Sequence, residues 1–239
     1  MIKLSKVLFG MVYLVIQSAT GFAQTNYPDV TIVGAMKNVM WKGQLYGTIN
    51  LDTISNKAHL YGIGPIEYLK GELMILDGRS FKSTVVNDST MKVEETYNSR
   101  APFFGYTHIS KWEEHLLPDS IITLEQLQNY LNKITGTFKR PFMFKMSGHV
   151  DEATIHVVNL PDGSKVSSPN DAHTGQKNFK ITKQDADIVG FFSTEHQTIF
   201  THHDTFLHLH LLTKNHKQMG HVDEMSVQKG KMKLLLPIE

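Results

Sequence analysis

Two histidines alternate with leucines in residues 206–222, which read FLHLHLLTKNHKQMGHV. If this segment is a β-strand, His208 and His210 point to the same side, because strand side chains repeat every two residues. The polar residues 213–218 are long enough to turn the chain. A return strand would then place His221 directly opposite His210, with Cβ atoms about 5 Å apart. The spacing therefore predicts a β-hairpin that brings three imidazoles to one point.

Three converging imidazoles have the chemistry of a metal centre. Zinc binds histidine nitrogen at about 2.0–2.1 Å, and catalytic zinc sites use three protein ligands and keep one position open. Copper, nickel, cobalt and iron also bind neutral imidazole, so we expect Zn2+ or another divalent transition metal. The leucines between the histidines favour this interpretation, because a buried leucine face fixes the direction in which the histidines point. The same pattern occurs in unrelated metalloproteins, so it predicts a metal without specifying a reaction.

The other histidines near the hairpin are interpreted as solvated residues. They lie at the expected strand start and hairpin tip: His202, His203 and His216. The chain contains no cysteine, so nitrogen and oxygen ligands alone would hold a metal.

Residues 1–23 have the pattern of a cleaved signal peptide. Two lysines precede the apolar run 7–16, and Gly21 and Ala23 occupy the −3 and −1 positions of a cleavage site. The apolar run is shorter than the roughly 20 residues that cross a bilayer. We therefore expect a secreted or periplasmic protein.

The charge of the chain after its leader is close to neutral. The 24 basic and 23 acidic residues become 22 and 23 when the two leader lysines are removed. This balance argues against nucleic acid or an anionic membrane as a partner. We expect a small-molecule substrate, and the sequence leaves open whether the chain forms a homodimer.

Residues 28–136 are expected to form an N-terminal sheet subdomain with one helix. Short segments rich in β-branched and aromatic residues, separated by Gly and Asp, are typical of strands. The predicted strands lie at 30–35, 58–64, 71–78 and 80–86. The helix is predicted by a capping box from Thr123 to Gln126 and by leucine and isoleucine at helical spacing up to Ile134.

Residues 137–239 are expected to form a second sheet subdomain that carries the histidines. Its predicted strands lie at 141–150, 153–160, 186–193 and in the two arms of the hairpin. The polar segment 161–177 predicts a loop. Together these patterns predict an α+β protein of two mainly β subdomains with few helices, and with a metal site on a β-hairpin of the C-terminal half.

Several segments resemble the acetolactate decarboxylase family. The most specific are FLHLHLL with MGHV, which match the family's histidine hairpin, and KGELMILDG at 70–78. Further segments resemble the family in the same order along the chain: YGIG at 61–64, APFFGYTHI at 101–109 and DIVGFFS at 187–193. The resemblance covers most of the chain after its leader.

The resemblance implies a metal-dependent enzyme that decarboxylates 2-acetolactate to acetoin and carbon dioxide. It implies that His208, His210 and His221 are the metal ligands, and that Glu72 contributes to the metal shell or handles a proton. Loss of carbon dioxide from a β-keto acid leaves electrons on the ketone as an enediolate. A metal stabilises that charge as a Lewis acid, and an acid then protonates the carbon.

Two features depart from the family pattern. His156 stands where the family has an arginine for the substrate carboxylate, and a neutral imidazole lacks the two parallel hydrogen bonds of a guanidinium. We assign His156 to the active site in its place. The chain also ends at LLLPIE, so the family's tail carboxylate is missing unless Glu239 or the C-terminal carboxylate replaces it.

These departures leave two alternatives to acetolactate decarboxylation. One is a metalloenzyme that acts on another hydroxy-keto acid or hydrolyses its substrate. The other is a periplasmic metal- or ligand-binding protein that has lost turnover.

Overall fold

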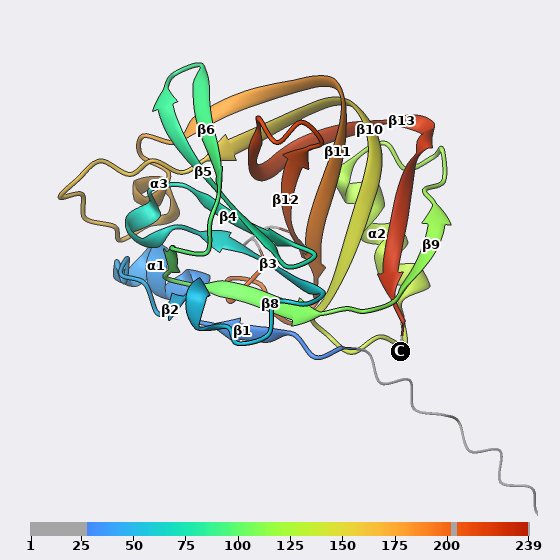
Figure 1. The fold of residues 1–239 in the computed structure, drawn as a ribbon, viewed down its shortest axis with the longest axis horizontal. Coiled ribbons are helices and arrows are strands. Elements are labelled where there is room, and N and C mark those ends of the chain that lie inside the picture. The colour runs from blue at the N-terminus through green and yellow to red at the C-terminus, as the bar shows by residue number, and fades with distance from the viewer. Residues whose placement is uncertain (1–27, 202–204, 239) are drawn as a thin grey trace, which may run out of the picture.

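A computed structural model of the chain describes residues 28–201 and 205–238. Most of its regular structure is antiparallel β-sheet, with three α-helices in those two ranges (Figure 1). The prediction of an α+β fold dominated by sheet is confirmed. The leader lies outside the described residues, so the signal peptide stays a prediction. No helix in the described ranges is long and apolar enough to cross a membrane.

The first sheet has six strands in the order β1-β8-β3-β4-β5-β6, and neighbouring strands are antiparallel. Its strands are β1 (Thr31–Val33), β3 (Leu60–Pro65), β4 (Glu72–Leu76), β5 (Arg79–Asn87), β6 (Thr90–Glu95) and β8 (Phe104–His108). A separate two-stranded ladder joins β2 (Ile49–Asn50) and β7 (Arg100–Ala101). Short 3-10 turns lie at Leu51–Thr53 and Glu67–Leu69.

The second sheet has the order β10-β11-β12-β13-β9, and β10 also pairs with β13, so four of its strands close on themselves. Its strands are β9 (Trp112–Leu116), β10 (Phe142–Val157), β11 (Lys177–Phe192), β12 (Leu207–Thr213) and β13 (Met219–Pro237). Figure 1 shows β10, β11 and β13 as long arching strands. The subdomain boundary expected at residue 136 stays a prediction; β9 precedes it and pairs with β13.

The expectation of two separate strands at 141–150 and 153–160 is wrong, because β10 runs through both segments. Its register against β13 shifts between Val150 and Glu152. A bulge of this kind lets a strand absorb an irregular polar stretch without ending.

Helix α2 (Leu124–Ile134) forms where the sequence predicted it. The Thr123 hydroxyl accepts a hydrogen bond from the Gln126 N–H at 3.2 Å, and the Gln126 side chain accepts one from the Thr123 N–H at 3.1 Å. This confirms the capping box. Leu127 and Leu131 are buried against the second sheet.

Two short helices were not predicted. Helix α1 (Met36–Lys42) has no side-chain cap at Ala35, and its first N–H groups donate to the carbonyl oxygens of Thr198 and Ile199 instead. Helix α3 (Pro169–Ala172) lies in the segment expected to be a loop. Both are too short for an apolar periodicity to be visible in the sequence.

Strand β12 separates two parts of the core. Its three alternating leucines pack in one cluster with Leu127 and Leu131 of α2. Leu212, on the opposite face, packs in a second cluster with Ile63 of β3 and Met74 of β4. The histidines of β12 share the face of Leu212, so the fold directs them into the space between the two sheets.

Gly220 lies on β13 immediately before His221. A Cβ at this position would lie 2.4 Å from the backbone oxygen of His156, which belongs to β10. We expect Gly220→Ala to lower the free energy of unfolding by about 1–3 kcal/mol, as overpacking does. Tm should fall by about 2–4 °C for each kcal/mol in a chain of this size. Thermal unfolding of the purified protein measures this.

The control is Gly136→Ala, because no atom lies within 4 Å of a Cβ at that position. We expect its stability to change by no more than about 0.5 kcal/mol. Equal losses of Tm in both variants would contradict the role assigned to close strand packing at Gly220.

Candidate metal centre

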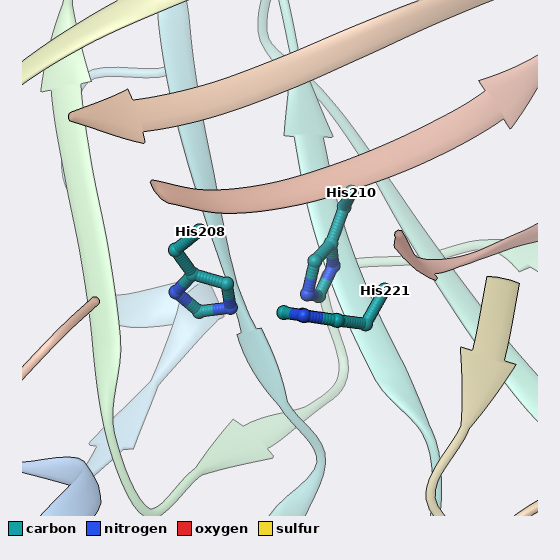
Figure 2. A group of neighbouring side chains, drawn as sticks. All are labelled: His208, His210 and His221. Carbon is teal, nitrogen blue, oxygen red and sulfur yellow. The ribbon is translucent and has the colours of Figure 1, made fainter. Parts of the chain in front are cut away.

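The hairpin of β12 and β13 places His210 directly opposite His221, as the sequence predicted. The ligand nitrogens of His208, His210 and His221 all lie within 4.8 Å of one another. The ring centroid of His208 lies 5.2 Å from each of the other two, and those two are 5.6 Å apart. Figure 2 shows the three rings turned toward one another from the two strands.

Burial holds these rings in place. His208 is 3% exposed and His210 is 0% exposed, whereas His221 is partly exposed. The leucine face of β12 is buried against α2, and this leaves the histidines facing the first sheet. Polar side chains buried to this degree almost always have a hydrogen-bond partner or a metal ion.

The surroundings of His210 show whether a metal ion would fit the centre. Neither of its ring nitrogens has a well-formed hydrogen bond. Burial lowers the pKa of His210 well below its ordinary value of 6.5, the neighbouring His208 and His156 lower it further, and a weak interaction with the Leu73 backbone acts in the opposite direction. The imidazole is therefore kept neutral, which is the form that binds metal. The three imidazoles could hold a divalent transition metal, and zinc suits this ligand set.

Glu72, at the start of β4, lies beside the histidines and is only 3% exposed. Its Oε2 is 3.6 Å from Nε2 of His210, and its Oε1 accepts a hydrogen bond from the Val158 N–H at 3.3 Å. Burial raises the pKa of Glu72 well above its ordinary value, the Val158 hydrogen bond opposes this, and the charge of Asp223 adds to it. Glu72 is therefore a buried carboxyl group that is suited to carry a proton.

His156 lies on β10, opposite His221 in the β10–β13 ladder. Its ring stacks on the His221 ring, with centroids 4.7 Å apart and an interplanar angle of 29°. Nδ1 of His156 lies 2.7 Å from Oδ1 of Asp223. Because the Asp223 carboxylate can only accept, Nδ1 donates this hydrogen bond. Nε2 of the neutral ring is then an acceptor.

The centre borders a small cavity of about 30 Å³. Its polar lining is Glu72, His156, His173, His208 and His221. Its apolar lining comes from α1, from β3 and from residues next to strands β3, β8 and β10: Met36, Met40, Pro65, Leu69, Phe103 and Val158. Within residues 28–201 and 205–238, no lysine or arginine lines this cavity.

Two further residues of the candidate site were not predicted: Asp223, which contacts His156, and His173, which lines the cavity. Asp223 follows His221 by two residues on the same strand, so strand periodicity could have placed it on the same face. His173 lies at the end of α3, and its ring centroid is 5.8 Å from that of His156. No sequence pattern marks His173, because tertiary packing of a polar segment brings it to the site.

A larger groove, of about 590 Å³, lies between the start of α2 and strands β10, β11 and β13. None of the three histidines lines it, and the cluster of three ligand groups found in residues 28–201 and 205–238 lies elsewhere. The candidate metal ligands His208 and His221 line the smaller cavity instead, so size alone does not identify the candidate site.

The antiparallel sheets bring together three histidines, two of them buried, with a buried carboxyl group beside them, and this arrangement is a candidate metal centre. The model of the family Alpha-acetolactate decarboxylase matches residues 33–236. The chain belongs to this family, as its sequence segments suggested.

Solved structures support the fold. An alpha-acetolactate decarboxylase from Bacillus subtilis strain 168 is 20% identical, with a TM-score of 0.72 over 88% of this chain and 85% of that chain. An acetolactate decarboxylase from Bacillus subtilis subspecies spizizenii is 20% identical, with a TM-score of 0.72 over 88% and 86%. A Staphylococcus aureus protein of unknown function similar to alpha-acetolactate decarboxylase is 17% identical, with a TM-score of 0.70 over 88% and 86%. A comparison with curated proteins finds no match.

Some predicted residues lie outside the part of the chain that the structure describes. They are His202, His203 and Glu239, and their interpretation stays a prediction. His216, expected to be solvated at the hairpin tip, is partly exposed, and its ring contacts Phe81 edge-on with centroids 4.9 Å apart.

If the three histidines hold zinc, His208→Ala removes one ligand and leaves the other two unable to retain the ion. We expect the bound zinc to fall from about one ion per chain to nearly none after dialysis. Elemental analysis measures this. His216→Ala is the matched control, because it removes a histidine from the same hairpin outside the ligand set. Full zinc content in His208→Ala would contradict the assignment.

The raised pKa of Glu72 predicts how stability depends on pH. The folded protein binds a proton on Glu72 that the unfolded chain releases above about pH 4.5. The free energy of unfolding therefore decreases as pH rises above about 4.5, because the unfolded chain gains stability by releasing this proton. Below that pH both states keep the proton, and Glu72 makes no pH-dependent contribution. We expect Glu72→Gln to raise the Tm of the metal-free protein at about pH 8, by about 2–4 °C for each kcal/mol relieved, and to leave it unchanged at about pH 4.

Thermal unfolding at both pH values measures the effect of Glu72→Gln. Glu152→Gln is the control, since Glu152 is exposed on β10. A Tm difference between wild type and Glu72→Gln that is the same at both pH values would count against a buried carboxyl group with a raised pKa.

Proposed function

We propose that this chain decarboxylates 2-acetolactate to acetoin and carbon dioxide. The observation that carries the proposal is a buried carboxyl group, Glu72, placed 3.6 Å from a buried histidine of a three-histidine group. That group has the donor set of a metal centre, and the chain belongs to a family that is named for this reaction.

The reaction consumes a proton, because the carbon that loses carbon dioxide gains hydrogen. Burial raises the pKa of Glu72, which favours the protonated form of this carboxyl group, and that form can deliver a proton to that carbon. The N–H of Val158 holds Oε1 of Glu72, which leaves Oε2 on the side of His210.

A divalent metal held by His208, His210 and His221 would act as a Lewis acid toward the negative charge that develops on the substrate oxygens. The protein contributes the surroundings of that charge. The mainly apolar wall of the cavity excludes water and so strengthens electrostatic interactions inside it.

We assign His156 the role of hydrogen-bond acceptor for the substrate hydroxyl. Asp223 accepts the Nδ1–H of His156, so Nε2 is the acceptor whenever the ring carries a single proton. In this form His156 does not bind a carboxylate as a guanidinium does. The substrate carboxylate is then left without an ion pair to this residue.

A second candidate function is action on another hydroxy-keto acid. The observation that favours it is the lack of lysine and arginine in the cavity lining within the described ranges. A protein that binds metal without turnover is the non-enzymatic alternative. We also propose that the chain acts outside the cytoplasm, on the basis of the leader pattern in residues 1–23.

The purified, zinc-loaded protein should release acetoin from racemic 2-acetolactate at least about tenfold faster than the His208→Ala protein. The His208→Ala blank corrects for spontaneous decarboxylation, and His216→Ala should match the wild type. Colorimetric measurement of acetoin over time gives both rates. No acetoin above the blank from a fully zinc-loaded protein would overturn the proposal, and turnover of a different hydroxy-keto acid would favour the second candidate.

A further inference from the structure

Helix α1 contributes two methionine side chains to the apolar lining of the cavity. Met36 and Met40 are four residues apart, so both lie on one side of the helix. They are 4% and 7% exposed, and both line the cavity together with His208 and His221. The sequence pattern did not predict this helix, and the chemistry described so far assigns it no role.

Contacts at both ends hold α1 in place. At its start, the N–H groups of Met36 and Lys37 donate to the carbonyl oxygens of Ile199 and Thr198, at 2.8 Å and 2.7 Å. At its end, Gly43 has a φ of 61° and packs so closely on the Val166 carbonyl that a Cβ would lie 2.8 Å from its oxygen. The helix therefore cannot move away easily when a substrate enters, and only the methionine side chains can adapt.

We propose that Met36 and Met40 set the size of the alkyl group that the site accepts on the tertiary carbon of its substrate. This inference rests on the proposed function, because the substrate class is a 2-hydroxy-3-keto acid. Such a carbon carries a hydroxyl, a carboxylate, an acyl group and one alkyl group. The alkyl group has no polar partner, so it belongs against the apolar part of the lining.

The dimensions of the cavity favour a methyl group. The cavity is only about 30 Å³, so an alkyl group enters by displacing lining side chains, and a longer alkyl group requires a larger displacement. One additional methylene in an apolar pocket changes kcat/KM by about 10- to 200-fold. The wild-type protein should therefore prefer 2-acetolactate over its ethyl homologue, in which ethyl replaces the methyl group on the tertiary carbon, by a factor in this range.

The test compares kcat/KM for these two substrates in zinc-loaded variants. Met40→Ala and Met36→Ala should each reduce the preference for methyl at least about tenfold, because they remove the wall. Met40→Leu keeps an apolar side chain of similar volume and should retain the preference. Met232→Ala is the matched control, since Met232 is a buried methionine, 1% exposed, in the core cluster on the α2 side of the second sheet.

A second readout does not depend on turnover. Reducing the ketone of each substrate gives an alcohol that cannot lose carbon dioxide. Calorimetric titration of the two alcohols into each zinc-loaded variant should give the same order of preference. If the alcohols bind with the expected preference but acetolactate is not decarboxylated, the proposed function fails and the role of the methionines stands.

Three outcomes in the wild type and the alanine variants, and a fourth in the control, would overturn the inference. The first is a methyl-to-ethyl preference that is unchanged in both alanine variants while their zinc content and folding remain intact. The second is a wild-type protein that does not distinguish the two alkyl groups. The third is no binding of either alcohol to the zinc-loaded wild type. An equal change in Met232→Ala would assign the effect to general loosening of the core and would also count against it.

Discussion

The leucines of β12 pack against α2, and this burial sets the direction of every histidine on the strand. Because strand side chains alternate, the leucine face and the histidine face cannot be exchanged without a one-residue slip that would expose the core. The position of His208 and His210 is thus stabilised by hydrophobic contacts that they do not make themselves. The same contacts keep the two imidazoles buried, and burial keeps His210 neutral.

Strand β10 pairs with β13 and so closes part of the second sheet. This pairing brings further polar groups to the three histidines. It places His156 opposite His221 and brings Asp223 within 2.7 Å of the His156 ring. The first sheet adds Glu72 from β4, so the site uses residues that lie far apart in the sequence. Burial of these ionisable groups raises the pKa of Glu72 and lowers that of His210.

Nδ1 of His156, which the sequence resemblance predicted at the position of a family arginine, donates its hydrogen bond to Asp223. A guanidinium offers fixed donors and permanent charge, whereas this imidazole offers an acceptor. The three-histidine group is present beside it. The rest of the pocket is shaped by apolar side chains, including those of α1, which the loop at Thr198 and Ile199 holds over the cavity.

The sequence alone determined the hairpin, its register and helix α2, because each depends on local rules. Alternation fixes the faces of β12, the short polar turn fixes which residues are paired, and a capping box marks the helix start. Tertiary structure decided which groups meet the histidines. The contact between Glu72 and His210, the Asp223 hydrogen bond to His156 and the approach of His173 depend on strand pairing and packing between distant segments, which no local pattern encodes. Helix α1 also required the fold, since its first N–H groups are satisfied by backbone carbonyls more than 150 residues away in sequence rather than by a cap of its own.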